Sequence, residues 1–401
     1  MSQQMKAFLV GGCVRDRLLG LPVNDCDWVV VEATPEEMTD KGFQRVGKGF
    51  PVYLHPETGE EYALARVGWG EHASFHPAAT LEDDLRHRDF TINAMALEEN
   101  GRLIDPLGGS ADLAAKVIRA VGASLAEDPV RVLRAARFTA RLDGFEIAPE
   151  TLAEMARLAA VGALAGLTPE RVWRELDKAL ATPRPSRFFL ALREAGALAP
   201  LFPEIDALFG VPQRPEYHPE IDTGIHTMMV VDMAARLTEN RAVRFAALVH
   251  DLGKGATPPQ EWPRHHGHEE RGAALVGPFV QRLAGPSLWA ELGILSARWH
   301  GLVHKVAELR HGTVLDILEA TDSFHRPERL DALLIAAEAD KRGRLGNEDA
   351  SYPQAELWRR ALAAATVVTA RDLVDAGHAP GPKLAELLFQ RRAEAIRKAL
   401  G

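Results

Sequence analysis

The feature that most restricts the fold is a change of hydrophobic pattern near residue 127. Before it, apolar segments at 7–10, 27–31 and 61–67 are typical of strands, the last with side chains alternating at period two, and 13–19 is typical of a short amphipathic helix. From Glu127 onward, long Ala-, Leu- and Arg-rich segments at helical spacing are punctuated by Pro and Gly stops, with no strand pattern of any length. The sequence therefore predicts a mixed α/β head followed by an all-α body.

Length and charge narrow the possibilities further. A chain of 401 residues is too long for one core, and at roughly 100–200 residues per domain we expect two to four domains. The net charge of −9 gives no overall attraction for phosphate, so any nucleic-acid surface must be local. Residues 131–193 carry eleven Lys and Arg against seven Asp and Glu, a net +4, which favours an RNA-binding body but also fits solvated helices. Basic side chains in the last helical segment equally fit compensation of the helix dipole; they are Arg391, Arg392, Arg397 and Lys398.

The two cysteines, Cys13 and Cys26, fit neither a disulfide framework nor a Cys-rich zinc site, so the reducing cytoplasm is the expected location. The chain has no apolar run near the ~20 residues of a membrane span, and its first residues lack the apolar core of a signal peptide. We therefore expect a soluble protein without a membrane partner.

A glycine turn and a pair of carboxylates stand at the start of the chain. Gly11 and Gly12 follow an apolar strand and open a helix, where backbone N–H groups can face a phosphate, and Arg15 lies one turn further. Asp25 and Asp27 lie two residues apart at the start of a strand, so both carboxylates share one face. Such a pair repels unless a cation lies between, and two Mg²⁺ ions there would suit nucleotidyl transfer. The alternatives are a purely structural turn and a solvated Asp-x-Asp turn.

Two further groups of residues fit a nucleotide. Arg88 can bind triphosphate oxygens, and Asp89 or Asn93 can bind a ribose hydroxyl, although an ordinary Arg–Asp surface pair fits equally well. The residues from Asp128 to Arg141 form the second group and begin a helix with Pro129 in its first turn.

On that helix, Arg134, Arg137 and Arg141 fall within a ~60° arc, a stripe suited to polyphosphate or, taken alone, to a solvated face. Asp128 and Arg131 can project side by side. Their acceptor and donor match the edges of cytosine and adenine and oppose those of uracil and guanine, so the pair predicts discrimination between bases.

Histidine is concentrated in the helical region, since nine of the fifteen lie between residues 218 and 311. His250 and Asp251 end a helical segment, and His226 lies on the helix predicted before it. Asp340 can complete a metal-binding set that activates water against a phosphate ester, and Lys254 can hold that phosphate. A core histidine and several other carboxylates are the competing interpretations. Five more histidines can line the pocket and are not assigned as ligands: His265, His266, His268, His300 and His304.

Taken together, seven segments resemble, in order, the motifs of bacterial CCA-adding tRNA nucleotidyltransferases, in the multifunctional form that carries an HD domain. They are Gly11-Gly12-Cys13-Val14-Arg15-Asp16, Asp25-Cys26-Asp27, Arg88-Asp89-Phe90-Thr91-Ile92-Asn93-Ala94, Glu127-Asp128-Pro129-Val130-Arg131, Leu201-Phe202-Pro203-Glu204-Ile205-Asp206, His218-Pro219-Glu220-Ile221-Asp222-Thr223-Gly224-Ile225-His226 and His250-Asp251-Leu252-Gly253-Lys254-Gly255. The resemblance extends to about residue 345. The sequence departs from the family pattern in two places. His87, rather than a second arginine, precedes Arg88. The segment 68–79 is short, and it lies near a loop that the family uses when changing from C to A addition.

The resemblance implies four parts: a polymerase-β-like head with a mixed sheet at 1–125, a helical neck and body that reads the base and binds tRNA at 126–205, an HD phosphohydrolase domain at 206–345 and a helical tail at 346–401. It implies that Asp25 and Asp27 are catalytic and hold Mg²⁺, and that Asp128 and Arg131 read the base. The remaining residues that it places around ATP or CTP are Gly12, Arg15, Arg88, Asp89, Arg134 and Arg137.

In the HD site the resemblance implies a divalent metal, Mg²⁺, Ni²⁺ or Mn²⁺, with His226, His250, Asp251, Lys254 and Asp340 around it. It implies 2′,3′-cyclic phosphodiesterase, 2′-nucleotidase and phosphatase activities there, beside the addition of C, C and A to tRNA, in a monomer or homodimer. The alternatives are a poly(A) polymerase on the same scaffold, a phosphohydrolase whose head only binds RNA, and a tRNA-binding protein without catalysis.

Overall fold

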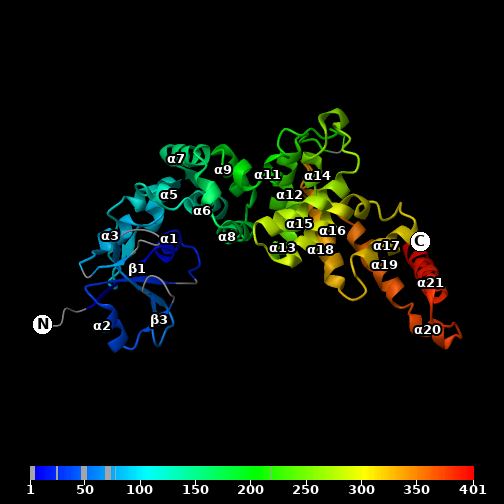
Figure 1. Cartoon of the computed structure of the whole chain (residues 1–401), viewed down its shortest axis with the longest axis horizontal. Coiled ribbons are helices and arrows are strands. Elements are labelled where there is room, and N and C mark those ends of the chain that lie inside the picture. Colours follow the sequence, from blue (N-terminus) through cyan, green and yellow to red (C-terminus); the bar gives the residue numbers. More distant parts are fainter. Residues whose placement is uncertain (1–4, 24–25, 47–51, 68–73, 77, 217) are drawn as a thin grey trace. The chain divides into compact units, whose positions relative to one another are not determined.

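The computed structural model describes residues 5–23, 26–46, 52–67, 74–76, 78–216 and 218–401. The chain divides into two compact units, coloured from blue to red along the sequence in Figure 1. Unit 1 comprises 1–167 and 194–197, and unit 2 comprises 168–193 and 198–401. The predicted change from a mixed α/β head to helices is confirmed. The four-part division remains a prediction.

Unit 1 is built on a seven-stranded mixed sheet with the order β3-β4-β5-β2-β1-β8-β9. β1 is antiparallel to β2 and β8, whereas β2 is parallel to β5. The strands are β1 (Lys6–Val10), β2 (Asp27–Val31), β3 (Gln44–Val46), β4 (Val52–Leu54), β5 (Glu61–Leu64), β8 (Ala96–Leu97) and β9 (Leu103–Ile104). Because β1 and β2 are antiparallel neighbours, with Val10 opposite Asp27, the glycine turn after β1 and the carboxylate at the start of β2 lie at the same end of the sheet.

Two strand predictions need correction. The single strand expected over 61–67 is divided, because β5 pairs with β2 up to Leu64 while β6 (Arg66–Val67) pairs instead with β7 (Ser74–Phe75). The body predicted to lack strands contains β11 (Glu146–Ile147), which pairs in parallel with β10 (Val117–Ile118). A two-residue strand is too short to give a periodic pattern in the sequence.

Local sequence signals explain several helices of unit 1. Thr34 and Thr80 form capping boxes with the third residue of α2 and α3, and Pro129 precedes α6. The helices are α1 (Gly12–Leu18), α2 (Pro35–Asp40), α3 (Leu81–Arg86), α4 (Gly109–Ala115), α5 (Ser124–Glu127), α6 (Val130–Arg141) and α7 (Pro149–Ala160), with short 3₁₀ turns at Thr91–Asn93 and Ala163–Gly166.

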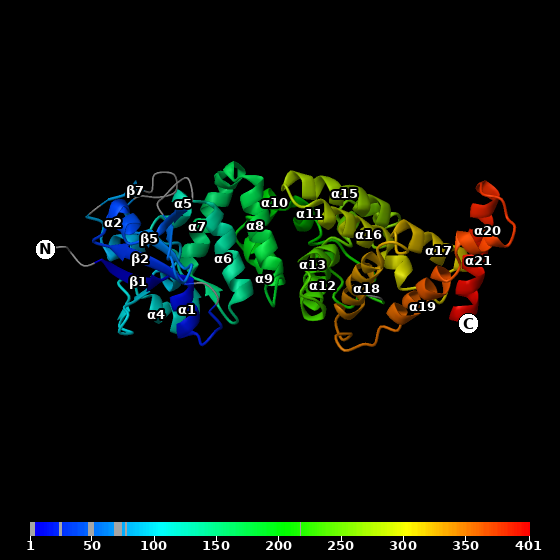
Figure 2. The same cartoon turned by 90° about the horizontal axis from the view of Figure 1, so that it is seen from below.

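In its described residues, unit 2 consists of helices joined by loops, with one isolated bridge between Pro212 and Asp222 (Figure 2). Its helices are α8 (Pro169–Leu180), α9 (Ser186–Glu194, the last residue of which belongs to unit 1), α10 (Leu198–Leu201), α11 (Pro203–Asp206), α12 (Thr223–Leu237), α13 (Arg241–Leu248), α14 (Leu252–Gly255), α15 (His268–Arg282), α16 (Ser287–Val303), α17 (His311–Ala320), α18 (Pro327–Arg342), α19 (Gln354–Thr366), α20 (Ala370–Asp375) and α21 (Pro382–Leu400). Within the described chain, none of the helices combines the length and the apolar character needed to cross a membrane.

An aromatic cluster fixes α8 to the rest of unit 2. The ring of Trp173 lies 5.8 Å from that of Phe245 on α13 and 4.9 Å from that of Trp289 on α16, measured between centroids. Trp173 also contacts the backbone of Gly285, where an added Cβ would lie 2.6 Å from the indole. Because such packing is close and apolar, α8 belongs to the core of unit 2.

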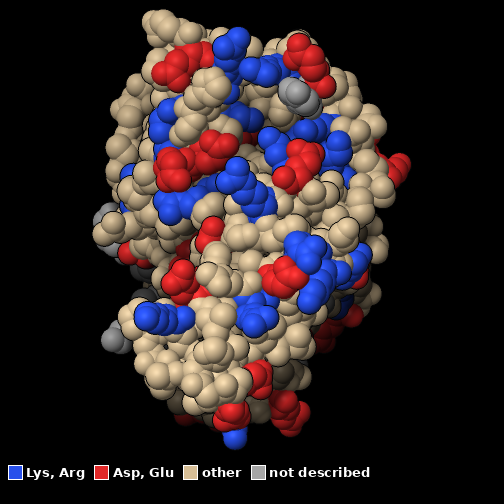
Figure 3. All heavy atoms as spheres, turned by 90° about the vertical axis from the view of Figure 1, so that its right-hand side faces the viewer, with Lys and Arg blue, Asp and Glu red and all other residues tan. Residues whose placement is uncertain are grey.

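The basic side chains of the last helix are interleaved with acidic ones. Figure 3 shows Lys and Arg beside Asp and Glu on the face that carries the C-terminal helices. Arg397 and Lys398 lie 2.7 and 3.7 Å from a carboxylate oxygen of Glu394, and Arg392 lies over the ring of Phe324. These contacts favour the interpretation of the tail as ordinary surface charge rather than as a tRNA contact.

Candidate functional site

The glycine turn of unit 1 lies beside a carboxylate and a guanidinium. Gly11 has φ of 76°, in the left-handed region, and lies between the end of β1 and the start of α1. A Cβ on Gly11 would lie 2.8 Å from Nη1 of Arg88 and 3.8 Å from Oδ2 of Asp27. Asp27 is the first residue of β2 and is exposed. The fold thus brings Asp27 and Arg88 to the turn, as a phosphate and metal site requires.

Part of the predicted head site lies outside the described residues. Asp25 is not among the described residues. The pair of carboxylates therefore remains a prediction, and Asp27 is its described member. Residues 68–73 and 77 of the short segment 68–79 also lie outside the described chain.

Beneath the turn, buried polar side chains form a continuous network. Arg15 donates to Oδ1 of Asn93 at 2.6 Å, and Nδ2 of Asn93 donates to Oδ1 of Asp89 at 2.9 Å. Arg134 donates from Nε and Nη2 to Oδ2 of Asp89 at 2.8 and 2.5 Å. Burial raises the pKa of Asp89, but Arg134 and Asn93 more than offset this and lower it overall.

The nucleotide-binding roles predicted for Asp89, Arg15 and Arg137 remain predictions, and the network shows what else these side chains contact. Both carboxylate oxygens of Asp89 accept hydrogen bonds within the protein, so Asp89 fits a residue that positions Arg134 better than one that binds a ribose. Arg15 is 2% exposed and also pairs with Asp16, so it supports the turn from below. The Arg137 side chain is buried against the Phe138 ring rather than displayed on an open stripe.

Two buried carboxylates were not singled out from the sequence. Asp84 accepts a hydrogen bond from Arg88 at 3.0 Å and lies 3.5 Å from Arg66, and it orients Arg88 toward the turn. Asp16 pairs with Arg141 at 2.7 Å, which ties α1 to α6. The spacing of four residues between Asp84 and Arg88 is a signal that sequence reasoning could have used.

The pair predicted to read the base, Asp128 and Arg131, lies where the chain enters α6. Asp128 is the last residue before Pro129, and Arg131 is in the first turn of the helix, with its N–H donating to the carbonyl of Asp128 at 3.0 Å. Burial lowers the pKa of Arg131 to about 10, although Asp89 and Asp128 act to raise it. Arg131 is still charged near pH 7, and both residues are half-buried. A half-buried carboxylate and guanidinium have the exposure needed to meet the edge of a base.

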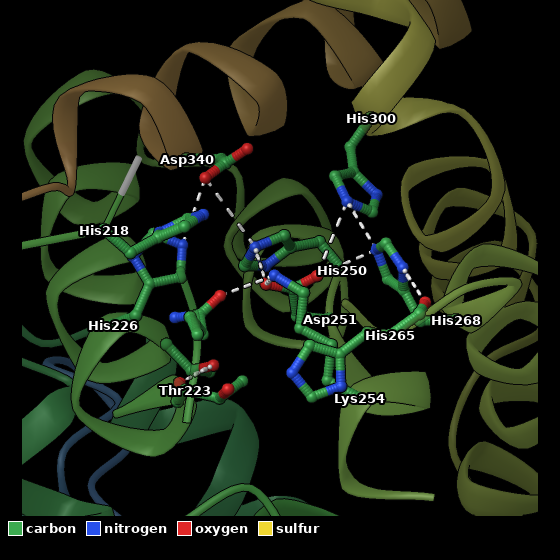
Figure 4. Close-up of polar contacts among 12 residues, drawn as sticks. His218, Thr223, His226, His250, Asp251, Lys254, His265, His268, His300 and Asp340 are labelled. Carbon is green, nitrogen blue, oxygen red and sulfur yellow. Dashed lines mark hydrogen bonds and ion pairs between the residues drawn. The ribbon is translucent and has the colours of Figure 1, made fainter. Parts of the chain in front are cut away.

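The second predicted site is assembled in unit 2 (Figure 4). Nε2 of His226, on α12, lies 3.1 Å from Oδ1 of Asp340 on α18. Nε2 of His250, between α13 and α14, lies 3.2 Å from Oδ2 of Asp251 and 3.9 Å from Oδ1 of Asp340. All four residues are at most 3% exposed, and one ligand atom from each of His226, His250 and Asp340 lies within 4.8 Å of the other two.

The hydrogen bond that His250 makes through Nδ1 leaves its Nε2 facing carboxylates, where a proton or a metal ion can lie. Nδ1 of His250 lies 2.7 Å from the carbonyl oxygen of Ala247, and since a carbonyl only accepts, this nitrogen carries the hydrogen. Nε2 of a neutral His250 is then a bare lone pair, and it has no hydrogen-bond partner among the described residues. A lone pair buried beside two carboxylates is unfavourable unless a proton or metal ion joins them, so the set fits a divalent metal.

Lys254 is held beside Asp251 at this site. Its Nζ donates to Oδ2 of Asp251 and to Oε1 of Gln213, both at 2.6 Å, and the side chain is buried. Burial raises the pKa of Asp251, but His250 and Lys254 hold it well below its usual value. Lys254 is thus close enough to meet a phosphate bound at the metal, although in this structure it neutralises Asp251.

Residues around the set orient its ligands. Glu220 lies 2.8 Å from Nδ1 of His226, measured from Oε1, and so favours the ring form with Nε2 directed at Asp340. His304 and Arg344 contact Asp340 at 2.6 and 3.1 Å. Burial raises the pKa of Asp340, but Arg344 and the histidines hold it well below its usual value.

Three family models match the chain. One described as "Poly A polymerase head domain" matches residues 7–119, and one described as "Probable RNA and SrmB- binding site of polymerase A" matches 144–209. The HD domain model matches residues 223–352, which include all the predicted ligands of the second site.

Full-length relatives decide the family. The multifunctional CCA protein of Thioalkalivibrio sulfidiphilus is 53% identical over 98% of this chain and 98% of that protein, and that of Nitrosococcus oceani is 54% identical over 99% of each. The chain belongs to the multifunctional CCA protein family. The resemblance inferred from the motifs is therefore confirmed.

Solved structures agree with a multifunctional CCA protein. The chain is similar to the Bacillus stearothermophilus CCA-adding enzyme in complex with CTP, with 26% identity, a TM-score of 0.64, and 98% of this chain and 89% of the other covered. It shares its fold with the Thermotoga maritima CCA-adding enzyme complexed with tRNA_CCA, at 20% identity, a TM-score of 0.60, and 99% and 91% coverage.

Proposed function

We propose that this protein adds C, C and A to the 3′ end of tRNA from CTP and ATP, and that its HD domain is a metal-dependent phosphohydrolase. The observation that carries the first activity is the approach of Asp27 and Arg88 to the Gly11 turn, in a chain more than half identical to multifunctional CCA proteins along its length. The cytoplasm, which keeps cysteines reduced, is the proposed location.

In the head, the backbone N–H groups after Gly11 and the start of α1 face the triphosphate. Arg88, oriented by Asp84, contacts its oxygens, and Asp25 with Asp27 would hold Mg²⁺. When bound there, Mg²⁺ makes the tRNA 3′-hydroxyl a better nucleophile and neutralises charge on the departing pyrophosphate. The buried network of Arg15, Asn93 and Asp89 keeps the turn and α6 rigid, which preserves the alignment of nucleotide and hydroxyl.

Asp128 and Arg131 select the base. A carboxylate accepts from the amino group of cytosine or adenine, and a guanidinium donates to the neighbouring ring nitrogen. Uracil and guanine present the opposite order, which leaves buried groups unpaired and costs binding. The basic segment 131–193 supports backbone recognition of the tRNA acceptor stem.

In the HD domain, His226, His250, Asp251 and Asp340 would hold a divalent metal, with Mg²⁺, Ni²⁺ and Mn²⁺ as the candidates. The metal, when bound, would lower the pKa of a water molecule, so that hydroxide is available to attack a phosphorus atom. Lys254 is close enough to bind the ester's phosphoryl oxygens, and Glu220, His304 and Arg344 fix the ligands. Phosphate esters of the 2′,3′-cyclic and 2′-phosphate type are the proposed substrates.

A poly(A) polymerase is the second candidate, because the model matching the head is described by that activity. The two candidates differ in nucleotide use. Incubation of tRNA lacking its last three nucleotides with CTP, with ATP, or with both, followed by sequencing of the 3′ ends, separates them. We expect two C with CTP and C, C, A with both, whereas a run of A with ATP alone would establish the rival.

Two variants assign the activities to their sites. Asp27→Asn should abolish incorporation and leave hydrolysis of 2′,3′-cyclic AMP unchanged, whereas His250→Ala should do the reverse. Hydrolysis is measured after chelation and re-addition of Mg²⁺, Ni²⁺ or Mn²⁺, which also identifies the preferred metal. Incorporation that survives Asp27→Asn would contradict the head assignment.

A further inference from the structure

The two cysteines of the chain lie together beside the glycine turn of unit 1. Cys13 is the second residue of α1, and Cys26 is the residue before β2. β1 and β2 are antiparallel, with Val10 opposite Asp27. Continued by one residue, this register sets Cys26 opposite Gly11, two positions before Cys13. Both thiols are free, and the chain has no other cysteine.

The sulfur of Cys13 meets groups from the segment that carries Cys26. Its S–H donates to the carbonyl oxygen of Val10 at 3.0 Å. Burial raises the pKa of the Cys13 thiol, the backbone N–H of Asp27 lowers this pKa through a hydrogen bond, and the Cys26 thiol raises it electrostatically and through a hydrogen bond. Because hydrogen bonds act over only a few ångströms, the two sulfur atoms lie within reach of each other.

The two thiols differ in their access to solvent. Cys13 is 4% exposed, whereas Cys26 is half-buried. A small oxidant therefore reaches Cys26 first, and Cys13 is already in place to react with the oxidised sulfur. In a reducing compartment, a cysteine pair of this kind forms a transient bond that responds to oxidants rather than a permanent crosslink.

We propose that Cys13 and Cys26 form a reversible disulfide that switches nucleotide incorporation off under oxidising conditions. Hydrogen peroxide oxidises the Cys26 thiol to a sulfenic acid and releases one water molecule. The Cys13 sulfur then attacks the Cys26 sulfur. The S–S bond forms as the S–O bond breaks, and the hydroxyl leaves as a second water molecule with the proton of Cys13. A dithiol reductant reverses the modification by exchange and is itself oxidised to a disulfide.

The bond acts on catalysis through Asp27, and for this consequence the inference rests on the proposed function. Asp27 follows Cys26 directly, and its Oδ2 lies 3.8 Å from a Cβ placed on Gly11. The sulfurs of two thiols in contact must approach to about 2.05 Å to form a disulfide, which draws Cys26 toward α1. A shift of about 1 Å in a catalytic group can cost about 100-fold in rate. We therefore expect oxidation to lower incorporation by about tenfold or more.

The test measures the bond and the activity separately in the full chain. Reduced protein is treated with hydrogen peroxide, the excess is removed with catalase, and free thiols are counted in denaturant. Mass spectrometry of unreduced peptides detects a link between Cys13 and Cys26 as the loss of two hydrogens. In the wild type we expect both thiols to disappear and incorporation into tRNA lacking its 3′ end to fall. Dithiothreitol should restore both.

Two variants are the controls. Cys26→Ala removes the accessible thiol and should incorporate nucleotides at the wild-type rate before and after peroxide. Cys13→Ala combined with Cys26→Ala has no thiol and measures oxidation of other residues. Circular dichroism melting verifies that each variant is folded, and serine replaces alanine in a variant that is not.

Three results would overturn the switch. They are free thiols that survive peroxide in the wild type, a disulfide that joins two molecules or leaves incorporation unchanged, and an equal loss of incorporation in Cys26→Ala. Reduced wild type that incorporates no nucleotide would contradict the proposed function instead, while the mass of the linked peptides would still test the bond.

Discussion

Arg134 on α6 donates two hydrogen bonds to a single oxygen of Asp89, at 2.8 and 2.5 Å, while the other oxygen of Asp89 accepts from Asn93. A carboxylate far from α6 in sequence therefore fixes the first turns of the helix that carries Arg131. The shape of the candidate head site depends on this buried ion pair as much as on the residues proposed to contact nucleotide.

Replacement of Asp89 by Asn should weaken both stability and catalysis. The variant leaves Arg134 without its charged partner, and loss of a hydrogen bond to a charged group costs about 1–3 kcal/mol, or a fall of several degrees in the melting temperature of unit 1. We expect at least a tenfold loss in kcat/KM for CTP. Glu98→Gln, which alters an exposed pair with Arg102, is the control and should change neither. An unchanged melting temperature in Asp89→Asn would contradict the role assigned here.

The same pair predicts a pH dependence. The pKa of Asp89 is lowered in the folded protein from its ordinary value of 3.8. Its stabilising contribution is therefore complete above that value and is lost as pH falls through the lower folded-state pKa. The difference in melting temperature between wild type and Asp89→Asn should be constant from pH 7 to 5 and shrink below about pH 4. A difference in melting temperature that grows on acidification would contradict a lowered pKa of Asp89 in the folded protein.

Base choice should depend on Asp128. Asp128→Ala removes the acceptor that pairs with the amino group of C or A. It also removes the unfavourable contact between this carboxylate and the carbonyl oxygen of a uracil or guanine base. We expect discrimination against these nucleotides to fall by about 10- to 100-fold, since an unpaired polar group costs about 1–3 kcal/mol. Competition assays with sequencing of the tRNA ends measure this. Glu127→Ala, an exposed neighbour, is the control; equal fidelity in both variants would refute base reading by Asp128.

Glu220 should control metal affinity without binding metal. Glu220→Gln weakens the partner of His226 Nδ1, and loss of such a partner costs about 10- to 100-fold in metal affinity. Calorimetry with Ni²⁺ measures the change, and the exposed Glu216→Gln is the matched control. Nucleotide incorporation should stay at the wild-type rate, and an unaltered Ni²⁺ affinity would show that Glu220 does not orient His226.

Two glycines of unit 2 should respond in opposite ways to alanine. Gly253→Ala forces α14 away from the carbonyl of His268 and should lower the melting temperature by several degrees and weaken metal binding. Gly277→Ala, inside α15 with nothing within 4 Å of the new Cβ, should stabilise by up to about 1 kcal/mol through helix propensity. The melting temperatures of the two variants, measured side by side, test both predictions. An unchanged melting temperature in Gly253→Ala would mean that α14 can shift without loss of stability.

Local patterns predicted much of this structure. The strand at 27–31 and the helix after Pro129 follow from apolar periodicity and from the position of proline, and the structure reproduces both. His226 and Asp340, 114 residues apart, meet as expected because motif order carries information about contacts that spacing does not.

The sequence alone could not predict contacts that form only when distant segments pack together. Asp16 and Asp84 look like ordinary surface acids until α6 and β6 bring Arg141 and Arg66 to them. The role of Asp89 depends on which cations reach it, and His268 and His300 converge because α15 and α16 pack against each other. Long-range pairing of polar groups leaves no periodic trace in a sequence.

The aromatic packing of Trp173 bears on how the protein can be dissected. A fragment that stops near residue 205 would keep this indole yet discard Phe245 and Trp289, the rings that enclose it, and would present α8 to solvent as an adhesive apolar face. Excision of the unit that contains the HD domain is therefore better begun ahead of Thr168, so that α8 stays with the helices it packs on.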